Sequence, residues 1–247
     1  MTTPHVVVLK RMLGATVLAM ASAGAAQAAV ITFEGNAGTA FNRDSFQEAG
    51  YTVTYIDPGA AAPPGTVPIG RYIDGSTPAS CGAGNICPLN NPSTYLDLFN
   101  SGFVDILPTE SGATFRFNAL DASFIAMAGV DYPPTPAALQ VIGFLPGGGQ
   151  TAIQFNLPQT TAFQTYTAAD AAGGAAFAMM DFTEIAIVGF RCNADGGCNG
   201  LDNGPGQIGL DNIDLSAPAV NDVPEPATAS LLAAGLLGLG LRTRRRS

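Results

Sequence analysis

The sequence predicts an all-β fold, a β-sandwich, that lies between two terminal segments with other roles. Between the termini, about ten short apolar or alternating runs are separated by turns, and the 247 residues include 30 glycines and 18 prolines. Few stretches show the 3.6-residue period of an amphipathic helix. Many short strands divided by Gly- and Pro-rich turns are typical of β-sandwiches.

The first 28 residues have the three parts of a secretory signal peptide. Lys10 and Arg11 form a basic region, residues 12–25 are apolar or small, and Ala26-Gln27-Ala28 is an Ala-x-Ala cleavage site. The alternative is a structured N-terminal helix. We therefore expect the signal peptide at 1–28 and an ectodomain at 29–222, which is long enough to bury a substantial core.

Within the ectodomain, residues 51–56 alternate with period two, and residues 138–144 and 151–157 flank a Pro-Gly-Gly-Gly turn as a hairpin. The first strand is expected at 30–34. Residues 57–91 predict an irregular excursion with a brief strand near 69–73. The remaining strands are expected at 95–98, 104–107, 113–120, 123–130, 163–167, 184–190 and 208–215, and short helices at 43–49 and 168–176.

The four cysteines form two local pairs. Cys81 and Cys87 enclose one Gly-rich loop, and Cys192 and Cys198 enclose another. In an exported protein such thiols pair, so we expect disulfides within each loop, with cross-links between the loops as the alternative. A zinc site is disfavoured because no histidine follows the signal peptide and the spacing is not Cys-x-x-Cys.

The ectodomain is strongly acidic. It keeps only Arg43, Arg71, Arg116 and Arg191, has no lysine, and holds nearly all of the chain's 19 acidic residues. Such a domain repels nucleic acid and anionic membranes, so neither is an expected partner. The carboxylates are suited to divalent cations, and the simpler interpretation is that they keep an exported protein soluble.

Several kinds of catalytic site are excluded by composition. The single histidine, His5, lies in the signal peptide, so the ectodomain has no Ser-His-Asp triad. Oxidised cysteines are not nucleophiles. Paired carboxylates of a glycoside hydrolase remain open, although no pair stands out. We expect a protein that is not an enzyme and assign no catalytic residue.

The C-terminal segment, residues 223–247, has three parts. Val223, Pro224, Glu225 and Pro226 form a stiff, extended peptide. Residues 227–241 carry no charge, and as a helix they would reach about 22 Å, less than the roughly 30 Å of a hydrocarbon core. The membrane stop is a basic cluster, which the positive-inside rule places in the cytoplasm, of Arg242, Arg244, Arg245 and Arg246. A buried C-terminal helix is the alternative.

This order of motif, apolar helix and arginines resembles the PEP-CTERM sorting signal of Gram-negative bacteria. The resemblance implies that a membrane transpeptidase-like exosortase recognises Pro224, Glu225 and Pro226 and removes the tail. The transmembrane helix would then be a transient inner-membrane anchor. The mature protein would reach the cell envelope or extracellular matrix, where it accompanies exopolysaccharide.

The ectodomain is similar to extracellular jelly-roll domains such as carbohydrate-binding modules, on residues 31–34, 117–124, 139–144 and 208–215. This resemblance implies a structural calcium ion where the first and last strands meet. The matching carboxylates are Glu34 and Asp211, and Asn36 adds a carbonyl oxygen. From the residues alone, Asp211 and Asn212 instead cap a turn.

We therefore expect a non-catalytic, exported surface protein associated with the envelope or with exopolysaccharide. The first alternative is a carbohydrate-binding module, in which tyrosines would stack on sugar rings with Asp, Asn and Arg on the hydroxyls. The chain has no tryptophan and six tyrosines, and strand tyrosines also pack at sheet margins. The second alternative is a polysaccharide hydrolase.

Overall fold

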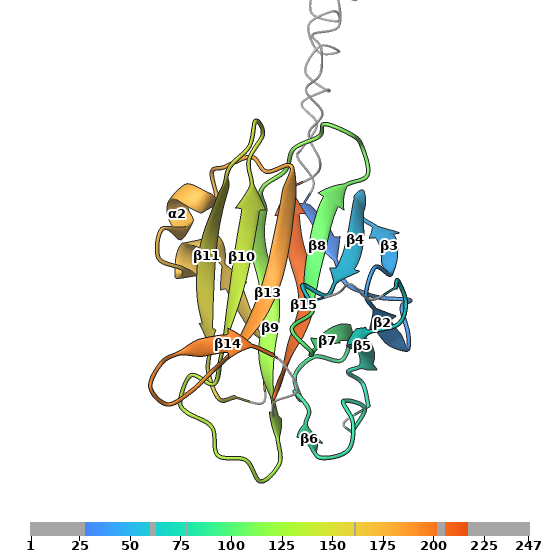
Figure 1. Cartoon of the computed structure of the whole chain (residues 1–247), viewed down its shortest axis with the longest axis vertical. Coiled ribbons are helices and arrows are strands. Elements are labelled where there is room, and N and C mark those ends of the chain that lie inside the picture. The colour runs from blue at the N-terminus through green and yellow to red at the C-terminus, as the bar shows by residue number, and fades with distance from the viewer. Residues whose placement is uncertain (1–27, 60–62, 78, 161, 202–205, 217–247) are drawn as a thin grey trace, which may run out of the picture.

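The computed structural model describes residues 28–59, 63–77, 79–160, 162–201 and 206–216. Two antiparallel sheets pack face to face (Figure 1), with only two short helical segments, η2 (Ala168–Asp170) and α2 (Gly174–Phe177). The expected all-β sandwich is therefore confirmed. Residues 1–27, which make up all but the last residue of the expected signal peptide, and the tail from residue 217 lie outside the described residues. In the described part, no helix is long and apolar enough to cross a bilayer.

One sheet has eight strands and contains the last strand of the sandwich at its centre. Its path is β12 (Gln164–Thr167), β9 (Phe117–Met127), β15 (Gln207–Ser216), β7 (Thr94–Leu98), β5 (Pro68–Asp74) and β2 (Thr39–Phe41). Off this path, β1 (Ala28–Ile31) pairs with β15, and β6 (Asn85–Ile86) pairs with β9. The first and last strands of the domain therefore lie side by side, as expected.

The other sheet has seven strands and faces the viewer in Figure 1. Its path is β11 (Gln150–Leu157), β10 (Ala137–Phe144), β13 (Glu184–Cys192), β8 (Phe103–Pro108), β4 (Tyr51–Ile56) and β3 (Ser45–Glu48), with β14 (Cys198–Gly200) pairing with β13. The hairpin of β10 and β11 is confirmed, with Phe144 opposite Gln150. The chain crosses repeatedly between the two sheets, as in jelly-roll sandwiches.

Alternation along the strands builds the core between the sheets. In β4, Tyr51, Val53 and Tyr55 are almost fully buried, while the threonines between them are half-buried. The buried hydroxyl of Tyr55 shares a 2.6 Å hydrogen bond with that of Tyr72, and the Tyr51 hydroxyl donates to the carbonyl of Ser216. The hydroxyls of Tyr51, Tyr55 and Tyr72 are thus hydrogen-bonded at the edge of the core.

A second, smaller cluster forms where the loop closed by Cys81 and Cys87 lies over the eight-stranded sheet. We call it the disulfide-loop cluster. On β7, Leu96 and Leu98 belong to the main core, so Tyr95, which directly precedes Leu96, points to the opposite face of the sheet. The cluster consists of Ile73, Cys81, Cys87, Tyr95, Ile125 and Phe163. The loop therefore buries apolar surface on the outer face of this sheet.

Two local predictions near the N-terminus were wrong. The first strand ends at Ile31, because Phe33 has a φ of 59°, which turns the chain out of the sheet. Glu34 therefore follows the strand and does not lie on it. The helix expected at 43–49 is instead strand β3, since Ala49 (φ 51°) and Gly50 (φ 87°) form the kind of two-residue turn that favours a hairpin. Pairing with β4 outweighs local helix propensity.

The strands expected at 113–120 and 123–130 are one continuous strand, β9. Asp121 does not interrupt it, because its carboxylate accepts hydrogen bonds from Thr165 Oγ1 at 2.5 Å and Asn212 Nδ2 at 2.9 Å. The helical segments expected at 168–176 are present as η2 and α2.

We predict that replacing both Cys81 and Cys87 with serine lowers the free energy of unfolding more than replacing Cys192 and Cys198. Both bonds close loops with the same sequence separation of six, so the chain-entropy loss is about 2 kcal/mol in each case. Only the first pair also packs within the disulfide-loop cluster. Urea unfolding measures both variants, and equal losses would contradict a packing role for that loop.

Candidate functional site

Two hollows adjoin at one end of the sandwich, where the loop after β9 approaches the loop between β13 and β14 (Figure 1). Their volumes are about 480 and 450 Å³, and they share Pro133, Cys192, Asn193 and Ala194. We call the combined hollow the end cleft. Its polar lining side chains are Asp131, Tyr132, Thr135, Gln154, Asn156, Arg191 and Asn193.

Strand alternation and loop hydrogen bonds position these groups. Gln154 and Asn156 are exposed on β11 because Ile153 and Phe155 point into the core. The Asn193 side-chain oxygen accepts hydrogen bonds from the backbone N–H groups of Asp195 at 3.1 Å and Gly197 at 2.8 Å. These bonds fix the shape of the loop between Cys192 and Cys198. Strand β11 therefore forms the floor of the cleft, and the disulfide-bonded loop between Cys192 and Cys198 forms one wall.

Tyr132 is held from two sides. Its ring packs edge-on against Phe124 at 4.9 Å between centroids, and its hydroxyl accepts a hydrogen bond from the Met127 backbone at 3.0 Å. Together with side-chain amides, one carboxylate and one guanidinium, this ring gives the end cleft the residue types that bind sugar hydroxyls and sugar faces. Asp131 is the only acidic residue among those that line it.

A third hollow, of about 450 Å³, lies on the outer face of the seven-stranded sheet. We call it the face groove. Seven of its nine lining residues are apolar, namely Ile56, Pro58, Phe103, Ile142, Phe144, Ala186 and Val188. The other two are Asp105 on β8 and Glu184 on β13. Strand register brings them together, since Asp105 lies opposite Ala186, two residues from Glu184 on the same face.

Burial and the neighbouring charge change the acidity of Asp105. Burial against the sheet raises its pKa to about 7, and the Glu184 carboxylate adds to the rise because the two groups interact. Asp105 therefore holds its proton up to near-neutral pH. An acidic group of this kind in a hollow is a common mark of a functional site.

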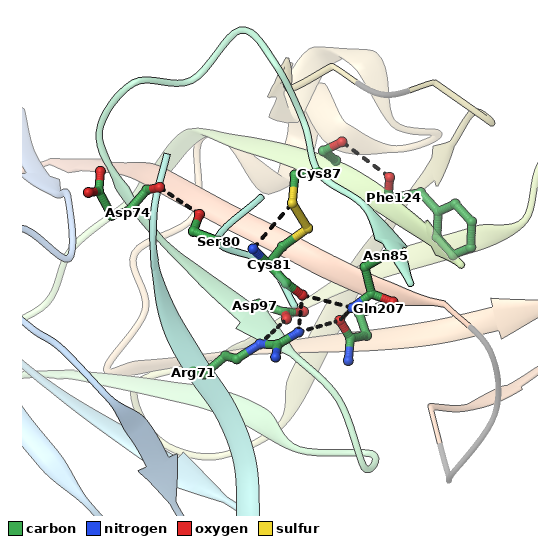
Figure 2. The surroundings of a disulfide bond; sticks show 10 residues. Arg71, Asp74, Ser80, Cys81, Asn85, Cys87, Asp97, Phe124 and Gln207 are labelled. Atoms are coloured by element: carbon green, nitrogen blue, oxygen red, sulfur yellow. Dashed lines mark hydrogen bonds and ion pairs between the residues drawn. A yellow bond between two sulfur atoms is a disulfide. The ribbon is translucent and has the colours of Figure 1, made fainter. Parts of the chain in front are cut away.

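A partly buried polar network fixes the loop between Cys81 and Cys87 to the eight-stranded sheet (Figure 2). Arg71 on β5 donates from Nε to Asp97 Oδ2 at 2.8 Å, and also to the carbonyl of Cys81. Asn85 joins by donating to the same Cys81 carbonyl at 2.8 Å and to Gln207 Oε1 at 3.0 Å. Burial raises the pKa of Asp97 to about 7, and the guanidinium offsets this only in part. This network is structural, because it lies under the loop.

Gly82 permits the close approach in this network. A Cβ at this position would lie 2.7 Å from the Arg71 guanidinium, and the residue has a φ of 95°.

The disulfides of the structure join Cys81 to Cys87 and Cys192 to Cys198, so each loop closes on itself as expected and the two loops are not cross-linked.

The two residues expected to hold calcium bind the same chain segment at different points. Glu34 Oε1 accepts a hydrogen bond from the Thr94 backbone at 2.9 Å. Asp211 Oδ2 accepts from Asn91 Nδ2 at 2.7 Å and from Ser93 Oγ at 2.6 Å, and burial raises its pKa. Among the described residues, no group of three or more His, Cys, Asp or Glu side chains is placed to hold a metal ion. Calcium there stays a prediction.

The face groove escaped sequence reasoning, although a signal was present. Strand β8 reads Phe-Val-Asp-Ile-Leu-Pro, in which both faces are apolar except at Asp105. Strand β13 is apolar on both faces after Glu184 until Arg191. A lone carboxylate in each of two such strands is unusual for a solvent-facing surface, but only the register of the sheet shows that they meet.

Comparison with known proteins identifies the C-terminal segment. Residues 222–246 match the PEP-CTERM protein-sorting motif. The expected sorting signal is therefore confirmed, and it indicates an exported protein. The assignment of Val223, Pro224, Glu225 and Pro226 as its recognition residues stays a prediction. The two disulfides agree with an extracellular environment. No curated protein matches the chain.

Two solved structures match the chain at low sequence identity and low TM-score. TmCBM61, solved in complex with β-1,4-galactotriose, is 8% identical with a TM-score of 0.33, and the match covers 68% of this chain and 88% of the other. The enzymatically active domain of tailspike protein 4 of bacteriophage CBA120 is 12% identical with a TM-score of 0.29, and the match covers 68% of this chain and 19% of the other. Neither likeness is close enough to indicate a shared activity.

We predict that Asp105→Asn flattens the pH dependence of stability. A carboxyl whose pKa is raised from 3.8 to about 7 on folding stabilises the protein fully below about pH 4 and loses that effect as the pH rises through 7. The wild-type free energy of unfolding should therefore fall over this range by on the order of 1 kcal/mol more than that of the variant, since solvent screens this half-buried group.

Urea unfolding at a series of pH values measures this difference, and Glu110→Gln, at an exposed turn, is the matched control. Parallel curves for the wild type and Asp105→Asn would contradict the raised pKa.

Proposed function

We propose that this protein is a non-catalytic component of the cell envelope or extracellular matrix, associated with exopolysaccharide. In this proposal an exosortase-type enzyme removes the C-terminal tail after a transient stay in the inner membrane. The sorting motif at 222–246 is the observation that carries the proposal. An acidic ectodomain with two stapled loops is consistent with life outside the cytoplasm.

A non-catalytic role is supported by the chemistry of the described sites. All four cysteines are in disulfides. The end cleft has one carboxylate among its lining residues, which leaves that site without an acid–base pair.

We predict that Glu225→Gln blocks removal of the tail. This variant keeps the shape of the motif between two prolines but removes the charge that we assign to enzyme recognition. Intact-mass analysis of the protein from membrane and secreted fractions should show the unprocessed chain in the membrane, while Glu110→Gln is processed normally. Normal processing of Glu225→Gln would count against the sorting mechanism.

Carbohydrate binding is the second candidate function, and the end cleft is the observation that favours it. Its amides, Tyr132, Asp131 and Arg191 offer donors, acceptors and a ring face at a rim formed by loops. Loops held by a rigid scaffold commonly carry binding residues. The ligand in this case would be an uncharged polysaccharide, because the lining supplies one group of each charge.

We predict that Asn156→Ala weakens binding of such a glycan about three- to tenfold, because it removes a hydrogen-bonding amide at the cleft floor. A glycan array identifies the ligand, and titration calorimetry compares the variants. Gln150→Ala is the matched control, since Gln150 is exposed at the opposite end of the same strand. Absence of any reproducible glycan on the array would leave the first proposal standing without this second one.

A further inference from the structure

The outer face of the seven-stranded sheet carries a mostly apolar surface at the face groove, on strands β8, β13 and β10. An antiparallel sheet with one solvated face normally places polar side chains there. Here the neighbouring outward positions of three strands carry half-exposed Phe103, Val188, Ile142 and Phe144. A contiguous apolar surface with a hollow in it is typical of a binding site.

The charge within this face groove has no cation to match it. Asp105 and Glu184 are its only charged lining residues. None of the four arginines of the described residues lines the groove. Arg71 pairs with Asp97 at 2.8 Å, Arg116 pairs with Asp181 at 2.7 Å, and Arg191 lines the end cleft. Arg43 follows β2 and is not among the residues that line the face groove. A cationic group on a ligand would therefore complement the groove, and an anionic ligand would be repelled.

The register of the sheet gives the groove a direction. Phe103 lies opposite Val188 on β13, and Phe144 lies opposite Glu184, four residues earlier on the same strand. The two rings are thus two strands and four residues apart, roughly 17 Å with ordinary sheet spacings. Asp105 lies between the two rings. This arrangement suits an extended ligand that contacts a ring at each end and a carboxyl pair along its length.

We propose that the face groove binds a polysaccharide that contains unacetylated amino sugars, with a sugar ammonium group at Asp105 and Glu184 and sugar ring faces on Phe103 and Phe144. The site is separate from the end cleft and concerns a cationic ligand, so it does not depend on the second candidate function.

A sugar fits this surface better than a peptide does. The backbone groups of β8, β13 and β10 are already paired within the sheet, so an extended peptide would find no ladder partners on the face. A sugar ring needs only an apolar platform for its C–H face and charged or polar groups for its substituents. The amine adds the charge that distinguishes this ligand from a neutral glycan.

Binding should be coupled to proton release. The titratable groups that face the groove are Asp105 from β8 and Glu184 from β13, while the lining residues of β4 and β10 are Ile56, Ile142 and Phe144. Below neutral pH, Asp105 is protonated. An ammonium group beside it favours the carboxylate, so its proton passes to the buffer as the ion pair forms.

The test is isothermal titration of the purified full chain at about pH 6, in two buffers of different ionisation enthalpy, which measures the protons released. The probes are a β-1,4-linked glucosamine trisaccharide, its fully N-acetylated counterpart, and spermidine. We expect the glucosamine trisaccharide to bind at least about tenfold more tightly than either, which corresponds to about 1.4 kcal/mol.

The variants identify the site. Glu184→Gln should weaken binding of the glucosamine trisaccharide about tenfold, Phe144→Ala should weaken it, and Asp105→Asn should abolish proton release. Glu110→Gln and the end-cleft variant Asn156→Ala should bind normally. Thermal unfolding checks that each variant is folded. If Asp105→Asn does not fold, the binding of the three probes to the wild type and the affinity of Glu184→Gln still test the proposed site.

Equal binding of the acetylated trisaccharide, or no binding at all, would overturn the proposal. Equal binding of spermidine would overturn it as well, because it would indicate simple attraction of cations to an acidic protein. Unaltered binding by Glu184→Gln would place any amino-sugar site elsewhere. None of these outcomes alters processing of the tail, so the proposed envelope role is judged separately by Glu225→Gln.

Discussion

The ion pair between Arg71 and Asp97 determines which face of this sandwich is closed. The guanidinium meets a fully buried carboxylate at 2.8 Å and also binds the carbonyl of Cys81. The loop stapled by Cys81 and Cys87 is thereby held over the eight-stranded sheet, where it buries Tyr95 and Phe163. Losing one member of such a pair leaves the other charge buried and unmatched. The covering loop and the sheet beneath it are therefore one structural unit.

The opposite sheet has no such cover over the face groove. Most of the apolar residues that line the groove, together with Asp105 and Glu184, stay partly exposed, although Asp105 Oδ1 is buried and has no hydrogen-bond partner among the described residues. The two sheets thus differ in the group that lies beside a buried aspartate. Asp97 is matched by a guanidinium within the protein, whereas Asp105 meets another carboxyl and is matched by nothing in its groove. That contrast is the physical basis for assigning structure to one face and binding to the other.

Much of the fold follows from local sequence. The other parts are decided by pairing between strands that are distant in the sequence. The alternation of Tyr51, Val53 and Tyr55 marks β4 because period two is a local property. Strand β3 was missed because its state is decided by the turn at Ala49 and Gly50 and by pairing with β4. The sorting motif and the disulfides within each loop were also recognisable locally.

The face groove could not be predicted in the same way. Asp105 and Glu184 are 79 positions apart in the sequence, and the lone carboxylate in each apolar strand does not by itself show that the two meet. They meet because β8 and β13 are neighbours in a particular register, and a shift of one residue would turn Asp105 into the core. Asp211 and Glu34 were chosen by resemblance to a family. In the structure each accepts hydrogen bonds from the segment 91–94, Asp211 from Asn91 and Glu34 from Thr94.

Carboxyl-carbon NMR titration of the two raised aspartates tests the contrast between the faces most directly. We predict that Asp97 and Asp105 both titrate near pH 7 in the free protein. Adding the glucosamine trisaccharide should lower the pKa of Asp105 and leave that of Asp97 unchanged. An Asp105 that titrates in the ordinary range of a solvent-exposed carboxyl, or that does not respond to the sugar, would contradict the account.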